Sequence, residues 1–362
     1  MQKIELTISP NYVPTWGIVE AIRELFQNAL DQETQCPGND MEWAYDEDEQ
    51  KLTISNKTSV LTASTLLLGT TTKAGDASTI GQFGEGYKIA TLVLLRNNKQ
   101  ITFYNYGAKE IWRPRFVKSR RFGTDVLTFF IEKVGMWSTV PDANLTIEVT
   151  GITRSEWEDE IIPSNLHLQY GVDTIEANEY GEVIDQPGRV YVNGLFVCEY
   201  EPYKYGYNFK PEHLRLDRDR KMVSDFDLRW AASKLWSYTE NTDKVLDLLE
   251  QGAADVAYID SASMSPTMWR DAAARRFRDV YGPEAIPITS QEELDAVPQG
   301  YKGIIVPRAY SEILSTRIHM PEPTPDSDGP KAKLQKLFDE LVLRYNISDE
   351  DVEAFNEIME DL

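Results

Sequence analysis

The sequence predicts an α+β protein whose helices pack on one face of a sheet rich in antiparallel strands. Several short segments alternate apolar and polar residues, which is the period of a half-buried strand. Two longer segments instead repeat apolar residues every three or four positions, as an amphipathic helix does. Because several strand segments follow one another directly in the first 165 residues, we expect them to pair antiparallel.

The first elements are expected to be a strand over 3–9, a helix over 15–31, and strands over 41–45 and 52–55. Thr15 can cap the helix, because its hydroxyl can accept a hydrogen bond from a backbone N–H of the first turn. The rest of this region is expected to hold a short helix at 62–68, a helix at 84–95 and strands at 101–106, 111–117, 125–132 and 145–149.

The character of the chain changes near residue 165. The stretch 188–198 alternates as two strands around Asn193 and Gly194, and an Asn-Gly pair favours a two-residue hairpin turn. A helix is expected over 225–250. A small α/β region should follow, with a helix at 266–281, a strand at 286–289, a helix at 290–296 and a strand at 303–306.

The C-terminal part is expected to be a linker followed by two helices. Residues 319–330 are rich in Pro and Asp, which disfavours regular structure. Helices are expected over 331–345 and 349–361, and one side of the second is apolar, so it should dock on its own chain or on a twin chain. The expected domains are residues 1–165, 166–250, 251–320 and 321–362.

The composition indicates a soluble protein. With 362 residues, the chain is long enough for two or more domains. It has no run of about 18 apolar residues and no apolar segment near its start, so we expect no membrane span, no signal peptide and a cytoplasmic location. Cys36 and Cys198 lie far apart, and the 3 histidines are scattered, so no metal-site spacing is present.

The formal net charge of −22 argues against broad electrostatic binding to nucleic acid, which needs a basic surface. A local run of Arg and Lys at 113–121 is interleaved with Trp112 and Phe116. Such a run is more typical of the solvated face of a hairpin than of a nucleic-acid interface. We therefore do not expect nucleic acid as a partner.

Two motifs carry most of the functional information. Glu24, Asn28 and Asp31 are spaced i, i+4 and i+7, so all three project from one side of the first helix. Residues 81–86 form a Gly-x-x-Gly-x-Gly turn that runs into the next helix, where backbone N–H groups can bind phosphate. A carboxylate, an amide and a phosphate-binding turn suit an ATPase. Taken alone, a polar triad on an amphipathic helix is most often a solvated face, and a glycine turn before a helix is common.

The segment before the glycine turn separates two kinds of nucleotide site. A dinucleotide-binding turn follows a strand. Residues 69–79 are instead small and polar, as in a loop that closes over a nucleotide. The sequence therefore disfavours a Rossmann turn.

Three ordered motifs resemble those of the GHKL ATPase superfamily, which includes gyrase, the heat-shock chaperones, histidine kinases and MutL. They lie at 23–31 (Arg-Glu-Leu-x-x-Asn-Ala-x-Asp), 68–75 and 81–87. Locally the chain resembles the heat-shock chaperone branch, and as a whole it resembles stand-alone members of phage and bacterial type. The resemblance implies a Bergerat-type α/β sandwich in the first region and a transducer-like α/β domain after it.

The resemblance also implies a role for each matched residue. Glu24 would be the general base that deprotonates the attacking water, and Asn28 would ligate Mg²⁺ through its amide oxygen. Asp31 would face the sugar or a water near it, and Lys73 and Lys88 would lie near the phosphates. The residues expected to contact the nucleotide are Asn28, Asp31, Asn56, Lys73, Gly81, Gln82, Phe83, Gly84, Glu85, Gly86, Tyr87, Lys88 and Thr146.

Asn56 departs from the family pattern, in which an Asp after this strand reads the adenine amino group and two glycines follow. An Asn carbonyl can still accept from adenine, but a flipped amide would present a donor, so the preference for adenine or guanine stays open. Asn56 could also be a plain turn residue. The family places a phosphate-contacting Thr on a late strand, where Thr124 and Thr146 compete. Strand order favours Thr146, and either can simply be a strand residue.

The run 216–223 resembles the chaperone loop that brings an arginine to the γ-phosphate from the second domain. Arg220 stands at that position and would stabilise charge in the transition state. Alternatively, Arg218 and Arg220 pair with neighbouring aspartates in a surface network.

Together these features predict an ATP-binding protein. The first interpretation is a Mg²⁺-dependent ATPase that forms ADP and phosphate and whose nucleotide state controls its conformation or dimerisation. The alternative is a nucleotide-dependent scaffold that does not hydrolyse ATP, with Asn56 marking an altered site. The retained Glu24 and glycine turn favour the first. The partners implied are the nucleotide, a second copy of the chain and another protein, but no membrane.

Overall fold

The computed structural model describes residues 1–67, 86–135, 137, 143–164, 172–214, 223–259, 267–319, 330–345 and 347–361. The chain divides into two compact units. The first unit comprises Met1–Asn241 with Ala253–Met264, and the second comprises Thr242–Gly252 with Ser265–Leu362. The residues Lys73, Gly81 to Glu85 and Arg220, for which the sequence predicts a role at the nucleotide, lie outside the described residues.

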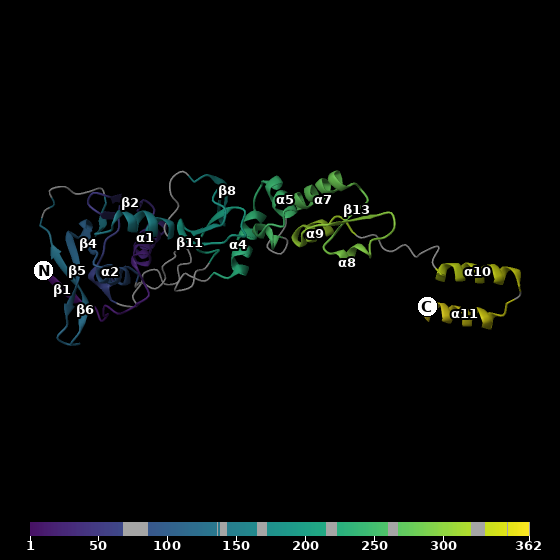
Figure 1. The fold of residues 1–362 in the computed structure, drawn as a ribbon, viewed down its shortest axis with the longest axis horizontal. Coiled ribbons are helices and arrows are strands. Elements are labelled where there is room, and N and C mark those ends of the chain that lie inside the picture. The colour runs from purple at the N-terminus through teal and green to yellow at the C-terminus, as the bar shows by residue number, and fades with distance from the viewer. Residues whose placement is uncertain are drawn as a thin grey trace. The chain divides into compact units, whose positions relative to one another are not determined.

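The first unit begins with a seven-stranded sheet (Figure 1). Its strand order is β1-β6-β5-β4-β7-β3-β2, and every pairing is antiparallel. The α+β architecture predicted from the sequence is confirmed. The strands are β1 (Gln2–Glu5), β2 (Met41–Asp46), β3 (Lys51–Asn56), β4 (Gln100–Asn105), β5 (Glu110–Lys118), β6 (Asp125–Lys133) and β7 (Leu145–Thr150).

Two helices, α1 (Ile18–Gln35) and α2 (Gly86–Arg96), share one hydrophobic core with the sheet. Alternate strand residues such as Leu52 and Ile54 face this core, while Leu25 and Phe26 enter it from α1. Each is essentially inaccessible to water, and burying such a side chain contributes about 1.5–3 kcal/mol. Short helical turns complete the region, at Ala63–Leu66, Tyr106–Ala108, Glu156–Ile161 and Ile162–Ser164.

The start of α1 differs from the expectation. The N-terminal cap is Gly17 rather than Thr15, and the Glu20 carboxylate accepts a hydrogen bond from the Gly17 N–H at 2.8 Å. The helix also continues to Gln35. A glycine cap brings no side chain of its own, so the acidic residue of the first turn satisfies the backbone donor instead.

Arg96, the last residue of α2, ties the segment before α1 to the second helix. Its guanidinium donates to the carbonyl oxygens of Pro10, Tyr12, Val13 and Trp16 at 3.1, 3.0, 3.2 and 2.6 Å. One planar group with five N–H donors can satisfy several carbonyls at once. The contact holds the start of α1 against the end of α2, and so helps to fix the two helices that form the candidate site.

A second, five-stranded sheet follows in the order β11-β10-β12-β9-β8. Only β10 and β12 pair parallel. Asn193 and Gly194 have positive φ angles of 48° and 80°, which confirms the predicted hairpin turn between β10 and β11. The strands are β8 (Thr174–Asn178), β9 (Gly181–Ile184), β10 (Arg189–Val192), β11 (Leu195–Glu199) and β12 (Gly206–Phe209).

The single helix expected over 225–250 is wrong. The structure has α4 (Asp225–Ser237) in the first unit and α5 (Thr242–Glu250) in the second. The residues between them are held by β8, because Glu176 accepts hydrogen bonds from Thr239 and Asn241, both at 2.9 Å. A short turn at Ala254–Val256 returns the chain to the first unit.

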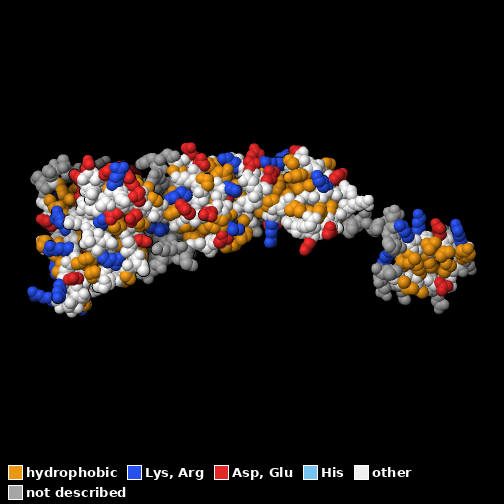
Figure 2. Space-filling view, in the orientation of Figure 1, with side chains coloured by type: hydrophobic (Ala, Val, Ile, Leu, Met, Phe, Trp, Pro, Cys, Tyr) orange, Lys and Arg blue, Asp and Glu red, His pale blue; other side chains and the backbone are white. Residues whose placement is uncertain are grey.

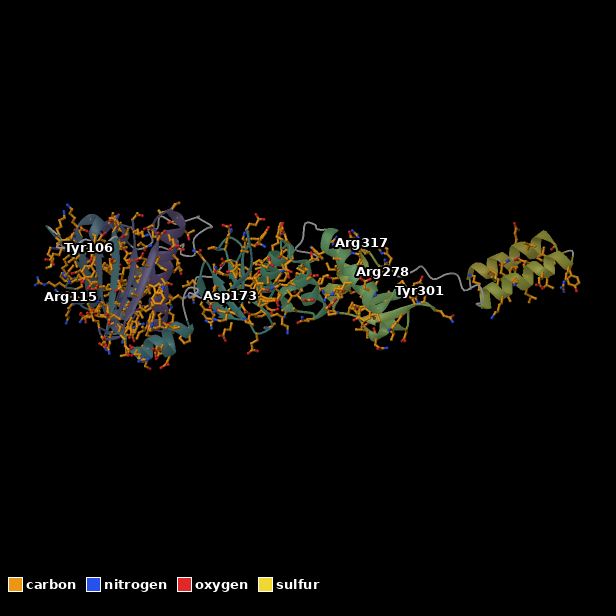
Figure 3. The ribbon with its side chains drawn as sticks, turned by 90° about the horizontal axis from the view of Figure 1, so that it is seen from above. Tyr106, Arg115, Asp173, Arg278, Tyr301 and Arg317 are labelled. Carbon is orange, nitrogen blue, oxygen red and sulfur yellow. The ribbon has the colours of Figure 1, made fainter. Side chains whose placement is uncertain are left out.

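The second unit combines helices with a two-stranded parallel sheet. Arg317 donates to Asp271 at 2.5 Å and so ties the end of α9 to α7; Figure 3 labels Arg317. Helix α9 was not expected from the sequence. The elements after α5 are α7 (Thr267–Tyr281), β13 (Ala285–Ile288), α8 (Gln291–Leu294), β14 (Lys302–Ile305), α9 (Arg308–Ser315), α10 (Pro330–Arg344) and α11 (Asp349–Asp361).

Among the described helices, none combines the length and the apolar character that crossing a bilayer would require.

Candidate functional site

Helix α1 presents a polar stripe that is not a solvated face. Glu24 is 4% exposed and Asp31 is fully buried, while Asn28 is half-buried beside them. Burying a carboxylate is costly, and a protein keeps one inside only where it interacts with other groups. The interpretation of these three residues as an ordinary solvated surface therefore does not hold.

Gly86 brings the first turn of α2 directly against this stripe. A β-carbon added to Gly86 would lie 2.2 Å from Oε2 of Glu24 and 3.1 Å from Nδ2 of Asn28. No other amino acid fits there unless Glu24 moves. The glycine at the end of the Gly-x-x-Gly-x-Gly motif thus joins the two halves of the predicted site in space.

Asn28 has a defined amide orientation. Its Nδ2 donates to the backbone carbonyl of Glu24 at 2.6 Å, one helical turn earlier. The side-chain oxygen is then left as the acceptor of the amide. An amide oxygen is a suitable ligand for a hard divalent cation.

Asn56 lies at the end of β3, on the sheet face that carries the helices. Its amide nitrogen donates to the backbone carbonyls of Ala29 and Asn39, both at 3.1 Å. Both N–H bonds of the amide are therefore used by buried carbonyl oxygens. A flip of the amide would set an oxygen against two oxygens, so Asn56 keeps its own carbonyl as an acceptor.

Tyr87 and Lys88 fasten the start of α2 to the chain that precedes segment 68–85. The Tyr87 hydroxyl and Thr65 Oγ1 are 2.9 Å apart, and the Lys88 ammonium donates to the Leu67 carbonyl at 2.6 Å. Burial raises the pKa of the Tyr87 hydroxyl well above its ordinary value, so it stays neutral. Lys88 was expected beside the phosphates; its side chain is fully buried in the structure.

Thr146 faces away from the helices, contrary to the expectation that it meets the phosphates. In the β3–β7 register, Asn56 is opposite Leu145 and Ser55 is opposite Thr146. Because paired residues lie on the same face and successive residues alternate, Asn56 and Thr146 lie on opposite faces of the sheet. Thr124 is exposed next to the start of β6.

Sequence reasoning missed Gln27. It is 1% exposed, and within the described part of the chain its side-chain oxygen is buried without a hydrogen-bond partner. Gln27 is three residues after Glu24 and four before Asp31, so helical spacing alone could have added it to the polar stripe.

Part of the basic run on β5 makes structural contacts within the sheet. Trp112 is fully buried in the core, so it is not available to stack on a base. Arg113 pairs with Glu132 at 3.1 Å, and the Arg115 guanidinium lies 4.0 Å from the Phe130 ring centre. Figure 3 labels Arg115 in this part of the chain. A hollow of about 430 Å³ lies beside these side chains, and none of the predicted site residues lines it.

Comparisons with known sequences give limited similarity. A family model described as the Mycoplasma pneumoniae MPN635 N-terminal domain matches residues 163–245, which include the five-stranded sheet and α4. An uncharacterised protein of Mycoplasma pneumoniae is 23% identical over 235 residues, which cover 62% of this chain and 92% of that protein.

Solved structures with some similarity include ATPase regions of type II topoisomerases. The ATPase region of Saccharomyces cerevisiae topoisomerase II is 11% identical with a TM-score of 0.30, and the match covers 50% of this chain and 62% of that one. The ATPase and transducer domains of the Balamuthia mandrillaris enzyme are 11% identical with a TM-score of 0.29, covering 50% and 60%. The chain thus spans less than two thirds of these structures, and similarity at this level does not define an activity.

Proposed function

We propose that this protein binds Mg-ATP where the first turn of α2 meets the polar stripe of α1. The observation that carries the proposal is the packing of Gly86 against Glu24 and Asn28, with an added β-carbon only 2.2 Å from the Glu24 carboxylate. A helix N-terminus offers unpaired N–H groups and a positive dipole end, which attract phosphate. The motifs that resemble the GHKL superfamily supply the same residues independently.

The residues fit a magnesium ion bound together with the nucleotide. Mg²⁺ prefers oxygen ligands and commonly takes only one or two from the protein, the rest coming from phosphates and water. Asn28 provides one such oxygen, because its amide nitrogen is engaged by the Glu24 carbonyl. When bound, the ion would neutralise charge that develops on the phosphates.

Asn56 supports recognition of the base through its carbonyl oxygen. Two buried carbonyls hold its amide nitrogen at 3.1 Å each, which orients the oxygen as the remaining polar atom. The adenine amino group is a hydrogen-bond donor, so an acceptor at this position can replace the Asp of the family pattern. We therefore favour adenine over an altered site.

Hydrolysis needs a base, and Glu24 is the candidate. Its carboxylate lies against the first residue of α2, so a water bound to this carboxylate would be close to a phosphate bound at that helix start. Accepting the proton of this water would make it a nucleophile. The nucleotide-dependent scaffold remains the alternative, and it differs by predicting binding without turnover.

Two further residues would complete the site. Lys73, outside the described residues, would contribute positive charge at the phosphates, and Arg220 would reach the γ-phosphate from the second sheet region. If so, Arg220→Ala should lower turnover by roughly 10- to 1,000-fold with little change in ADP affinity, while Arg218→Ala should have a mild effect. Equal and mild losses in both variants, tracking thermal stability, would indicate a surface salt-bridge network.

Isothermal titration calorimetry with ATP, ADP and GTP in the presence of Mg²⁺ tests whether the protein binds these nucleotides. We expect ATP to bind with a free energy of roughly −6 to −8 kcal/mol. Asn28→Ala should weaken Mg-ATP binding by about 10-fold or more, because it removes a metal ligand. Asn97→Ala is a matched control, since Asn97 makes the same helical bond, from Nδ2 to the Val93 carbonyl at 2.8 Å.

Two results would overturn the proposal. One is the absence of heat and of any thermal shift with every nucleotide. The other is an equal loss of affinity in the Asn28 and Asn97 variants. Phosphate release measured on the same samples separates the ATPase from the scaffold.

A further inference from the structure

The C-terminal helices α10 and α11 form a hairpin with a large exposed apolar surface. Phe338 and Phe355 stack between the helices, with ring centres 3.7 Å apart and planes at 6°. Several other apolar side chains of the hairpin are exposed, and Figure 2 shows apolar side chains over much of its visible face. These exposed residues are Leu334, Leu337, Leu341, Val342, Tyr345 and Ile358.

The exposed residues of α10 form one continuous stripe. At 3.6 residues per turn, Leu334, Leu337, Phe338, Leu341 and Val342 fall within an arc of about 140°. A neighbouring helix covers only part of such an arc. Leu337, at one edge of it, is 55% exposed, while Phe338 near its middle meets α11. The stripe is therefore wider than the contact with α11 uses.

The hairpin is also too small to be stable by itself. Its helices have only 15 and 13 residues, close to the length of about 12–15 residues below which isolated helices are marginal in water. Units below about 40 residues usually need a disulfide, a metal or association to fold. The hairpin region contains no Cys or His at positions 330–362, which leaves association as the source of additional burial.

The charges of the two helices indicate which partner would cover the stripe. Helix α10 has 4 Lys or Arg and 2 Asp or Glu, whereas α11 has 7 Asp or Glu and no Lys or Arg. A second hairpin related by a two-fold axis makes a four-helix bundle in which each α10 lies beside both acidic helices. Every neighbouring pair of helices in that bundle has opposite charge, and the two acidic helices are diagonal.

We propose that α10 and α11 are a dimerisation module, and that the exposed stripe of α10 packs against the hairpin of a second copy of this chain. The dimer forms without nucleotide, because the hairpin contains none of the residues of the ATP site. It keeps two copies together whatever the state of that site. Failure of ATP binding would leave this inference untouched.

Sedimentation velocity of the full chain without nucleotide tests the inference. At about 10 μM, the protein should have twice its chain mass of 41.3 kDa. Replacing Leu337 and Leu341 together by Glu should raise the dimer Kd by about 100-fold or more, since each change sets a charge in an apolar interface. The matched control is Val280→Glu with Ile305→Glu, two apolar residues of the same unit that are 64% and 55% exposed.

A charge variant serves as a second test that does not touch the apolar stripe. Lys333 and Arg344 are both exposed on α10 and flank the Leu337 edge of the stripe, so their replacement by Glu should not disturb the hairpin itself. It should raise the dimer Kd by about 10-fold or more, because acidic side chains at both positions would then lie beside an acidic helix of the second copy. A monomer at concentrations up to about 100 μM would overturn the inference, as would a dimer whose Kd neither variant changes.

Discussion

Replacing Gly86 by Ala tests the central contact of the candidate site with the smallest possible change. The added methyl would stand 2.2 Å from Oε2 of Glu24, whereas ordinary contact begins near 3.4 Å. The Glu24 carboxylate must therefore move by about 1 Å, a displacement that can cost an enzyme about 100-fold in rate. The methyl also comes to 3.1 Å from Nδ2 of Asn28, so we expect a smaller loss of Mg-ATP affinity as well.

The same substitution should change stability little. Overpacking costs about 1–3 kcal/mol, but the clash is with the far end of a side chain, and Ala is favoured over Gly in a helix by about 0.5–1 kcal/mol. A net loss of about 0–2 kcal/mol corresponds to a few degrees in Tm for a unit of this size. The variant should thus be folded and nearly inactive.

Phosphate release at saturating ATP, calorimetry and thermal unfolding measure these effects together. Gly135→Ala is the control, because a β-carbon there meets nothing within 4 Å. A folded Gly86→Ala variant with the wild-type kcat would contradict a role for this contact in turnover. A loss of activity that simply follows a large loss of stability would contradict it as well.

Substitutions at Glu24, Asn56 and Lys99 test the general base, the orientation of the Asn56 amide and the buried ion pair. Glu24→Gln should lower kcat by about 100- to 10,000-fold and leave the ATP Kd nearly unchanged, because a general base acts in the transition state and not in ground-state binding. Turnover at the wild-type rate would exclude Glu24 as the general base. Asn56→Asp should lower the free energy of unfolding by about 2–4 kcal/mol at pH 7, because an anion replaces two N–H donors that face carbonyl oxygens. The loss should shrink as the pH falls and the introduced carboxyl group becomes protonated. Urea unfolding at pH 7 and 4.5 measures this, and a loss that does not change with pH would contradict the assignment. Burial alone would raise the pKa of Glu156, but hydrogen bonds from Lys99 and Thr153 hold it below its ordinary value. The contact between Lys99 and Glu156, at 2.7 Å, therefore makes its full contribution to stability at pH values above the ordinary carboxyl pKa. This contribution decreases as the pH falls through the lowered pKa of Glu156. Lys99→Met should cost about 2–3 kcal/mol at neutral pH and clearly less near pH 4, and an equal cost at both would contradict the ion pair.

Local patterns in the sequence were enough to predict most elements of the first unit. The strands around Leu52 and Val149 and the two core helices follow from the periods of two and 3.6 residues. The turn at Asn193 and Gly194 follows from a dipeptide that tolerates positive φ. These features depend on neighbours in the chain, so they are visible without a structure.

The error over 225–250 has its physical origin in a contact between distant segments. Glu176 of β8 draws the chain after α4 out of the helix, and nothing near residue 239 indicates that partner. The error at Thr146, by contrast, could have been avoided from the sequence, because Leu145, Ile147 and Val149 alternate with it as core residues. That alternation predicts that Thr146 faces the other side of the sheet, and strand order alone was the weaker argument.

The orientation of the Asn56 amide could not be predicted either. The sequence leaves open which end of the amide faces a ligand. Only the folded chain brings the carbonyls of Ala29 and Asn39 to its nitrogen and so decides the matter. The burial of Glu24 likewise depends on α2, which lies about 60 residues further along the chain.

A structure determined with Mg²⁺ and a non-hydrolysable ATP analogue would show directly whether the nucleotide binds where α1 meets α2. We predict that the terminal phosphate lies at the first turn of α2 beside Gly86. The metal should be bound to the Asn28 side-chain oxygen, and the adenine ring should face Asn56. A nucleotide bound elsewhere, for example at the hollow beside Arg113, would contradict the account.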